Sequence, residues 1–245
     1  MKRSRGFSLI ELLCVTGIMA IIAAVLAPVL VSAKKSAMRA QCASNLRQIG
    51  QAFESYATDY AGCYPNTGSQ YLWAGFFWRE PLARYLQINT GNPGKRMVLS
   101  CPADPTPTGV YSGTSYAYSA CFYMEPEQVN AVADSDHMRA KYASTNPKLP
   151  CSNIKTSQVK FGSKKALVAE YWTLHSVDSD VGWYDGPETG HDPWSGERNC
   201  MFADSHVVYL STRRIRAAES PTVGRPRLLP DINLTTDGVA GKDID

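Results

Sequence analysis

The chain has 245 residues, enough for one large domain or two small ones, with 44% hydrophobic, 10% aromatic and 19% charged residues. This composition excludes a disordered chain and is typical of a globular protein. The formal charge is +3, but three basic residues (Lys2, Arg3 and Arg5) stand at the extreme N-terminus, and without them the basic count falls from 25 to 22 and equals the acidic count of 22. A chain near neutrality does not attract nucleic acid as a whole, so nucleic acid is not an expected partner.

A long uncharged segment, from Leu12 to Ala33, follows the basic N-terminus. As a helix its roughly 22 residues span about 33 Å, enough to cross the hydrocarbon core of a bilayer. Unlike the shorter apolar region of a secretory signal peptide, it continues directly into an amphipathic pattern. Pro28 is expected to kink this helix without ending it. Basic residues flank both ends, so their distribution leaves the orientation in the membrane open.

Glu11 is the one acidic residue at the start of this apolar segment. A carboxylate in a membrane segment costs free energy and usually has a specific partner. From the residues alone, two interpretations stay open: the side chain reaches the membrane interface, or it pairs with a positive charge.

The stretch RGFSLIELLCVTGIMAIIAAVLAPVL resembles the N-terminal segment of type IV pilins and type II secretion pseudopilins. The resemblance implies that a prepilin peptidase cuts between Gly6 and Phe7 and that the new N-terminal Phe7 is N-methylated. It also implies that Glu11 of one subunit pairs with the Phe7 amine of a neighbour, which relieves two charges in lipid and fixes the axial register. The leader, residues 1–6, then stays cytoplasmic and the rest of the chain faces the periplasm.

Beyond Lys35 the apolar residues recur at helical spacing along one face: Met38, Cys42, Leu46, Ile49, Phe53, Tyr56 and Tyr60. Polar residues, including Asn45 and Glu54, fill the predicted opposite face. Gly62 and Pro65 end the pattern. We therefore expect one helix from the membrane to about Tyr60, with its outer half packed on a sheet from the rest of the chain.

A second resemblance begins at CASNLRQIGQAFESYATDYAGCYP and continues in CPADP, SYAYS, KKALVAE and CMFADSHVVYL. These stretches are similar to pilin-like families abundant in Planctomycetes, Verrucomicrobia and Lentisphaerae. In those relatives the last stretch reads FADGHV and a histidine lies closer to its aspartate than the 13 positions between His191 and Asp204 here. The departure indicates a longer loop and weakens the assignment of His191 to that position.

The globular part is predicted to contain a small sheet. SYAYSACFYM and KALVAEYW have the composition of strands, and NCMFADSHVVYL indicates a hairpin that turns at Asp204 and Ser205. The fold class that follows is α+β and pilin-like, with the long N-terminal helix packed on a small antiparallel sheet. Residues 7–33 form the transmembrane and assembly helix, and 34–212 form the globular domain, which includes the amphipathic half of the helix. Five arginines and three prolines mark residues 213–245 as a basic, flexible C-terminal tail.

Seven cysteines are present, and the six outside the apolar segment permit disulfides in a translocated domain, with 15 possible pairings. Buried thiols are an equally open interpretation. No CxxC occurs, so the spacing indicates neither a zinc knuckle nor a thioredoxin-like site.

Known catalytic motifs such as HExxH, GxSxG and the P-loop do not occur in the sequence. The stretch HSVDSDVGWYDGPETGHD places Asp178, Asp180 and Asp185 close together, and their carboxylates suit a hard cation such as Ca²⁺. A solvated loop is the alternative. No positioned nucleophile accompanies these residues, so we expect no catalytic residues and no cofactor besides this possible Ca²⁺.

Together these features predict a non-catalytic structural subunit, a pilin or pseudopilin, stored as a single-pass prepilin in the inner membrane with its globular domain in the periplasm. Its expected partners are prepilin peptidase and other pilin or pseudopilin subunits, with which it assembles into a type IV pilus-like or type II secretion pseudopilus filament. Two alternatives stay open: a membrane-anchored periplasmic binding module that never polymerises, and a periplasmic hydrolase exported with a pilin-like segment.

Overall fold

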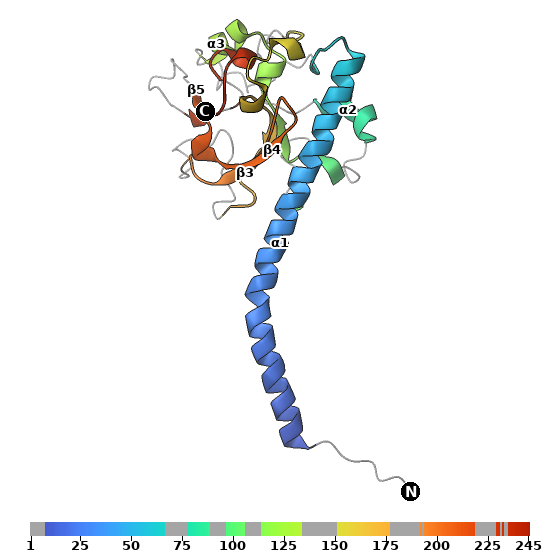
Figure 1. Cartoon of the computed structure of the whole chain (residues 1–245), viewed down its shortest axis with the longest axis vertical. Helices are drawn as coiled ribbons and strands as arrows, with labels where there is room; N and C mark the ends of the chain where they lie inside the picture. Colours follow the sequence, from blue (N-terminus) through green and yellow to red (C-terminus); the bar gives the residue numbers. More distant parts are fainter. Residues whose placement is uncertain are drawn as a thin grey trace, which may run out of the picture.

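The computed structural model describes a long helix and most of a globular domain. The described residues are 8–66, 78–88, 97–105, 114–133, 151–176, 192, 194–218, 229–230, 232 and 235–245. Helix α1 (Leu9–Asp59) projects from the domain, with its N-terminal half pointing away from it (Figure 1). The predicted pilin-like α+β fold, a long N-terminal helix packed on an antiparallel sheet, is confirmed.

Helix α1 runs unbroken for 51 residues, with Pro28 inside it. As predicted, this proline does not end the helix. The helix ends at Asp59, within a residue of its expected end, and Ala61 and Gly62 follow with φ angles of 53° and 79°. These left-handed conformations turn the chain back toward the domain. The outer half of α1 buries most of the predicted stripe: Cys42, Leu46, Ile49, Phe53 and Tyr56.

The sheet is a four-stranded antiparallel meander in the order β1-β2-β3-β4. Its strands are β1 (Tyr116–Tyr118), β2 (Ala166–Glu170), β3 (Glu197–Phe202) and β4 (Val207–Ser211). The β3–β4 hairpin turns where the sequence predicted: Ser205 has a φ of 67° and donates its backbone N–H to the Phe202 carbonyl at 2.9 Å. The hairpin prediction is confirmed.

The first predicted strand, SYAYSACFYM, is correct only in its first part. After Tyr118 the chain forms the 3-10 helix η3 (Ala120–Phe122), because the Ser119 side chain accepts the Cys121 N–H at 3.3 Å and caps that turn. Two further α-helices occur among the described residues, α2 (Arg79–Leu86) and α3 (Pro126–Ala133). In the described ranges the other 3-10 helices are η2 (Met97–Leu99), η4 (Thr156–Gln158), η5 (Gly162–Lys164), η7 (Thr212–Arg214) and η8 (Gly238–Ala240).

The main core lies between α1 and the sheet. Phe53 is at its centre, with its ring 5.8 Å from Trp78 and 5.0 Å from Tyr118 between centroids. Helix and sheet approach each other closely at Gly50, where an added Cβ would lie 2.7 Å from the Met201 Sδ on β3. Because the packing leaves no room there, a glycine at this position lets the helix lie directly on the strand.

The described residues of the C-terminal segment, 213–218, 229–230, 232 and 235–245, correct the prediction of a flexible tail from Arg213. Strand β5 (Ala217–Ala218) pairs with β6 (Leu229–Pro230), and Ile232 and Val239 are buried in the domain. Asp243 is also buried and forms an ion pair of 3.0 Å with the equally buried Lys165. Arginines and prolines suggested a solvated tail, but a fully buried lysine requires a partner, and the chain end supplies it.

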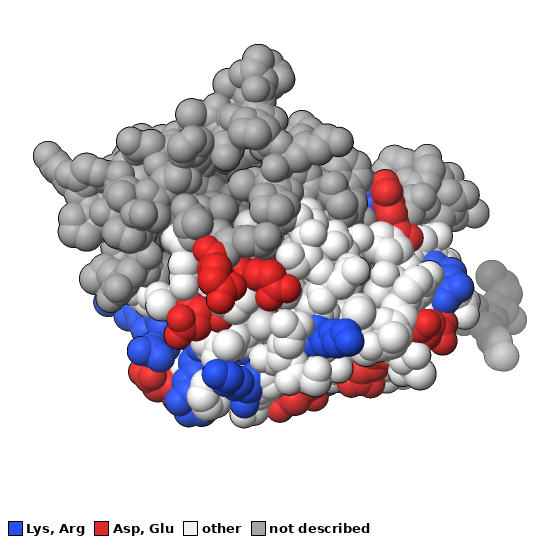
Figure 2. Space-filling view, turned by 90° about the horizontal axis from the view of Figure 1, so that it is seen from above, with Lys and Arg blue, Asp and Glu red and all other residues white. Residues whose placement is uncertain are grey.

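Figure 2 shows the molecule from above, with basic and acidic side chains interspersed over the described part of this face. This described surface presents no continuous basic area of the kind that binds a phosphate backbone.

Candidate functional site

The N-terminal half of α1 carries an apolar surface that no described part of the chain covers. Every residue from Ser8 to Ala37 is exposed, including Leu9 at 82% and Ile21 at 68%. An 18-residue window of the helix reaches a mean hydropathy of 2.6, long and apolar enough to cross a membrane. A surface this apolar does not stay in water, so lipid or other helices must cover it.

Glu11 lies in the first turn of this exposed half. Its carboxylate accepts the backbone N–H of Ser8 at 2.9 Å, as one arm of a capping box at the start of the helix. An acidic side chain here also faces the positive end of the helix dipole. The predicted processing residues Gly6 and Phe7 lie outside the described residues. The structure thus gives Glu11 a partner within its own chain, and its pairing with a neighbouring subunit stays a prediction.

Residues 1–27 match the prokaryotic N-terminal methylation motif. The motif covers Gly6, Phe7 and Glu11, and it implies processing by a prepilin peptidase. No curated protein and no solved structure shows significant similarity to the chain. The methylation motif and the long helix on an antiparallel sheet are similar to those of type IV pilins and pseudopilins, and the N-terminal segment is long and apolar enough to anchor the chain in a membrane.

The outer half of α1 is fastened to the domain where it enters it. A disulfide joins Cys42 on α1 to Cys101, with a Cα–Cα distance of 5.3 Å. One turn further on, the Asn45 amide donates to the Ser100 carbonyl at 3.1 Å and to the Tyr116 hydroxyl at 3.2 Å. Asn45 is only 3% exposed, so its predicted place on the polar face was wrong. The sequence permitted this cysteine pair but could not select it.

The β3–β4 hairpin also contacts the outer half of α1. The Arg39 guanidinium lies over the Tyr209 ring at 4.6 Å from its centroid, and the Ser205 hydroxyl donates to the Glu54 carboxylate. Burial, followed by the negative charge of Glu197, raises the pKa of Tyr209 to about 12, so the ring stays a neutral partner for the cation. The outer half of the helix is therefore fixed over several turns, and the exposed half continues from it without a break.

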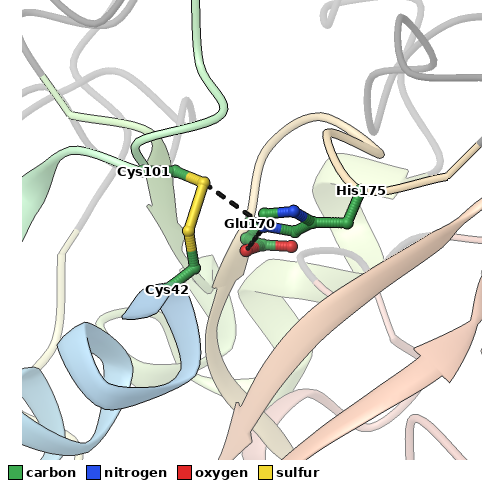
Figure 3. A group of neighbouring side chains, drawn as sticks. All are labelled: Cys42, Cys101, Glu170 and His175. Carbon is green, nitrogen blue, oxygen red and sulfur yellow. Dashed lines mark hydrogen bonds and ion pairs between the residues drawn. A yellow bond between two sulfur atoms is a disulfide. The ribbon is translucent and has the colours of Figure 1, made fainter. Parts of the chain in front are cut away.

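A buried polar cluster lies beside the disulfide (Figure 3). The His175 Nε2 is 3.3 Å from the Cys101 Sγ and 3.1 Å from the Glu170 Oε1. The two Glu170 oxygens also accept the side-chain amide and the backbone N–H of Asn199, each at 2.8 Å. Burial, and then the charge of Glu170, raises the pKa of the nearby Tyr116 far above its ordinary value. The cluster links α1, the end of β2, the segment after it and β3.

The predicted Ca²⁺ ligands Asp178, Asp180 and Asp185 lie outside the described residues, so that site stays a prediction. Within the described part, four metal-ligating side chains bring their ligand atoms within 4.8 Å of one another: Cys42, Cys101, Glu170 and His175. Sequence reasoning missed this group because its members lie far apart along the chain. One signal was present: Glu170 ends an apolar, fully buried strand, and a carboxylate in that place requires partners.

Proposed function

We propose that this chain is a pilin or pseudopilin subunit, cut between Gly6 and Phe7, methylated at Phe7 and assembled into a filament through the exposed half of α1. The proposal rests on the difference in exposure between the two halves of one unbroken helix. Its first half is apolar and wholly exposed, and its second half is locked onto a folded domain. Such a chain stores its assembly surface in the inner membrane and displays its domain in the periplasm.

Glu11 is the residue for which the free energies in lipid and in a helix bundle are expected to differ most. Lipid tails are as apolar as leucine, so moving the exposed half from lipid into a bundle of like helices yields little hydrophobic free energy. A carboxylate in the apolar region is costly in lipid, and pairing it with the Phe7 amine of a neighbour relieves two charges together. We infer that this pair supplies much of the preference for the filament over the dispersed subunit.

The capping contact to Ser8 makes a sharp test possible. Glu11→Gln keeps an oxygen that accepts the Ser8 N–H but removes the charge. We expect this variant to lose its leader normally and to form no filaments, as judged by mass spectrometry and electron microscopy. Glu80→Gln is the matched control, because Glu80 is also an exposed acidic residue in the first turn of a helix, α2.

Wild-type filament abundance in Glu11→Gln would contradict the charge-pair role and leave Glu11 as a capping residue. Loss of leader cleavage would instead assign Glu11 to recognition by the peptidase. A monomeric membrane-anchored binding module has no need of this charge, so the variant also separates the filament subunit from that alternative.

The finer assignments are proposals of the same kind. The later stretches CPADP and CMFADSHVVYL support a place among the pilin-like families of Planctomycetes, Verrucomicrobia and Lentisphaerae. We propose a non-catalytic role, with Ca²⁺ at Asp178, Asp180 and Asp185 as a separate possibility that calcium titration of the purified chain would test.

A further inference from the structure

The two cysteines of the Cys42–Cys101 disulfide lie next to Glu170 and His175, as Figure 3 shows. All four side chains are of metal-ligating type, and their ligand atoms lie within 4.8 Å of one another. We propose that Cys42, Cys101, Glu170 and His175 bind Zn²⁺ when the two cysteines are reduced. Disulfide and zinc site are then two mutually exclusive states of the same residues. The ligand set, two thiolates with an imidazole and a carboxylate, is one that zinc accepts in tetrahedral sites.

The distances around His175 fit such a site. Zinc bonds of about 2.3 Å to sulfur and about 2.0 Å to nitrogen and oxygen place tetrahedral ligands about 3.5 Å apart for N···S and about 3.3 Å for N···O. In the structure the His175 Nε2 lies 3.3 Å from the Cys101 Sγ and 3.1 Å from the Glu170 Oε1. The same ring nitrogen faces both ligands, so a metal between them would take the place of its hydrogen-bonding proton.

The surroundings already orient the carboxylate. Asn199 donates both its backbone N–H and its side-chain amide to Glu170, the kind of outer contact that fixes metal ligands in position. The side chains of Glu170 and His175 are 0% and 2% exposed, so water does not compete for the site. Two thiolates, one carboxylate and Zn²⁺ leave one net negative charge. The buried Arg198 donates to the backbone carbonyls of Glu170 and Tyr171, at 3.5 and 3.1 Å, and so places a positive charge beside one of the ligand residues.

Zinc and the disulfide cannot coexist. The two sulfurs of a tetrahedral site lie about 3.8 Å apart, so the S–S bond must be absent. Binding to the dithiol releases the two thiol protons. Oxidation by another disulfide reverses the state: the two thiolates lose two electrons and join, Zn²⁺ leaves, and the oxidant takes up two protons and becomes a dithiol.

Either state fastens α1 to the domain: the disulfide ties Cys42 on the helix to Cys101, and zinc would tie Cys42 to Glu170 on β2 as well. A newly made chain, whose cysteines are still thiols, would thus hold its helix in place through zinc until the disulfide replaces it. This inference does not depend on filament assembly.

The test uses the full-length chain in detergent, either oxidised or reduced with a phosphine. We expect the reduced chain to bind a single zinc ion and the oxidised chain none above background. We also expect Co²⁺ to give the visible bands of a tetrahedral site with a thiolate charge-transfer band.

His175→Gln removes a ligand and should weaken zinc binding at least about tenfold. Losing only an outer-shell contact already costs about 10-fold to 100-fold in metal affinity. His206→Gln is the matched control, because His206 is a partly exposed histidine that contacts Asp204 and is not among the four converging ligands. The double variant Cys42→Ser, Cys101→Ser measures how much zinc the other thiols of the reduced chain bind, and this amount is the background.

Equal zinc binding by the oxidised and reduced chains, or undiminished binding by His175→Gln, overturns the proposal. If reduction unfolds the domain, near-ultraviolet circular dichroism decides. Recovery of the signal on adding zinc, absent in His175→Gln, supports the site, and no recovery in the wild-type chain rejects it.

Discussion

The two halves of α1 form one helix but meet different surroundings. Leu13 in the first half is 66% exposed, and Leu46 in the second is fully buried. Cys14 is an exposed thiol, whereas Cys42 is tied to Cys101. The comparison shows that the helix owes its order to two sources. Its own domain supports the outer half, whereas no described part of the chain covers the first half, which on the proposed function is supported by lipid or by neighbouring subunits.

The disulfide should give the largest contrast between the halves. Replacing Cys42 and Cys101 by serine opens a loop with a sequence separation of 59 residues, and the chain-entropy relation predicts a loss of about 4 kcal/mol in the free energy of unfolding. Cys14→Ser is the matched control and should leave the domain's stability unchanged. Denaturant unfolding of the oxidised chain in detergent measures both. If Cys14→Ser lowered the free energy of unfolding as much as the double variant does, the two halves of α1 would not differ in their attachment to the domain.

Leucine truncation should show a somewhat smaller contrast. Leu46→Ala leaves a cavity between α1 and the sheet and should cost about 3 kcal/mol. Leu13→Ala removes the same atoms from a surface outside the domain and should cost the domain nothing. The same unfolding measurement applies, and a destabilised Leu13→Ala domain would show that the first half folds back onto it.

The reactivity of two thiols, exposed Cys14 in the first half of α1 and buried Cys200 in the domain, should also differ at a defined pH. Burial raises the pKa of the Cys200 thiol to about 12, so at pH 8 only about one molecule in ten thousand carries the reactive thiolate. In detergent-dispersed subunits at pH 8, iodoacetamide should modify Cys14 and spare Cys200, as read by peptide mass spectrometry. In assembled filaments Cys14 should become protected as well. Persistent labelling of Cys14 in filaments would place it away from the packed core.

The raised thiol pKa also predicts a pH dependence of stability. Because the folded-state pKa exceeds the ordinary value of 9.0, the stability from the neutral buried thiol is fully present below pH 9 and is lost as the pH rises toward 12. Cys200→Ala should flatten this alkaline decline in the free energy of unfolding. An unchanged decline would assign it to the buried tyrosines instead.

The contact between Arg39 and Tyr209, near the boundary of the halves, should give the smallest effect. Arg39→Ala removes the cation over the ring and should cost about 0.5–1 kcal/mol. Arg47→Ala, on the exposed face of the same half, is the matched control. A larger loss in Arg47→Ala than in Arg39→Ala would contradict the assigned contact.

The sequence predicted the features that repeat locally. The apolar stripe of α1 and the β3–β4 hairpin follow from spacings of a few residues, and the structure confirms both. What it missed depends on contacts distant along the chain. Asn45 looked like a solvated residue until Ser100 and Tyr116 were placed beside it. The fully buried Lys165 depends in the same way on a partner near the end of the chain.

The candidate sites divide in the same manner. The methylation motif at residues 1–27 is contiguous, and its residues were identified from the sequence. The cluster of Cys42, Cys101, Glu170 and His175 comes from distant segments, and only the fold brings it together.

The most direct test of the filament role is mass spectrometry of filaments sheared from cells that express the chain. The account predicts the chain in that fraction, beginning at Phe7 with one added methyl group on its N-terminus. A chain that stays in the inner-membrane fraction, mature and unassembled while filaments form without it, would contradict the account.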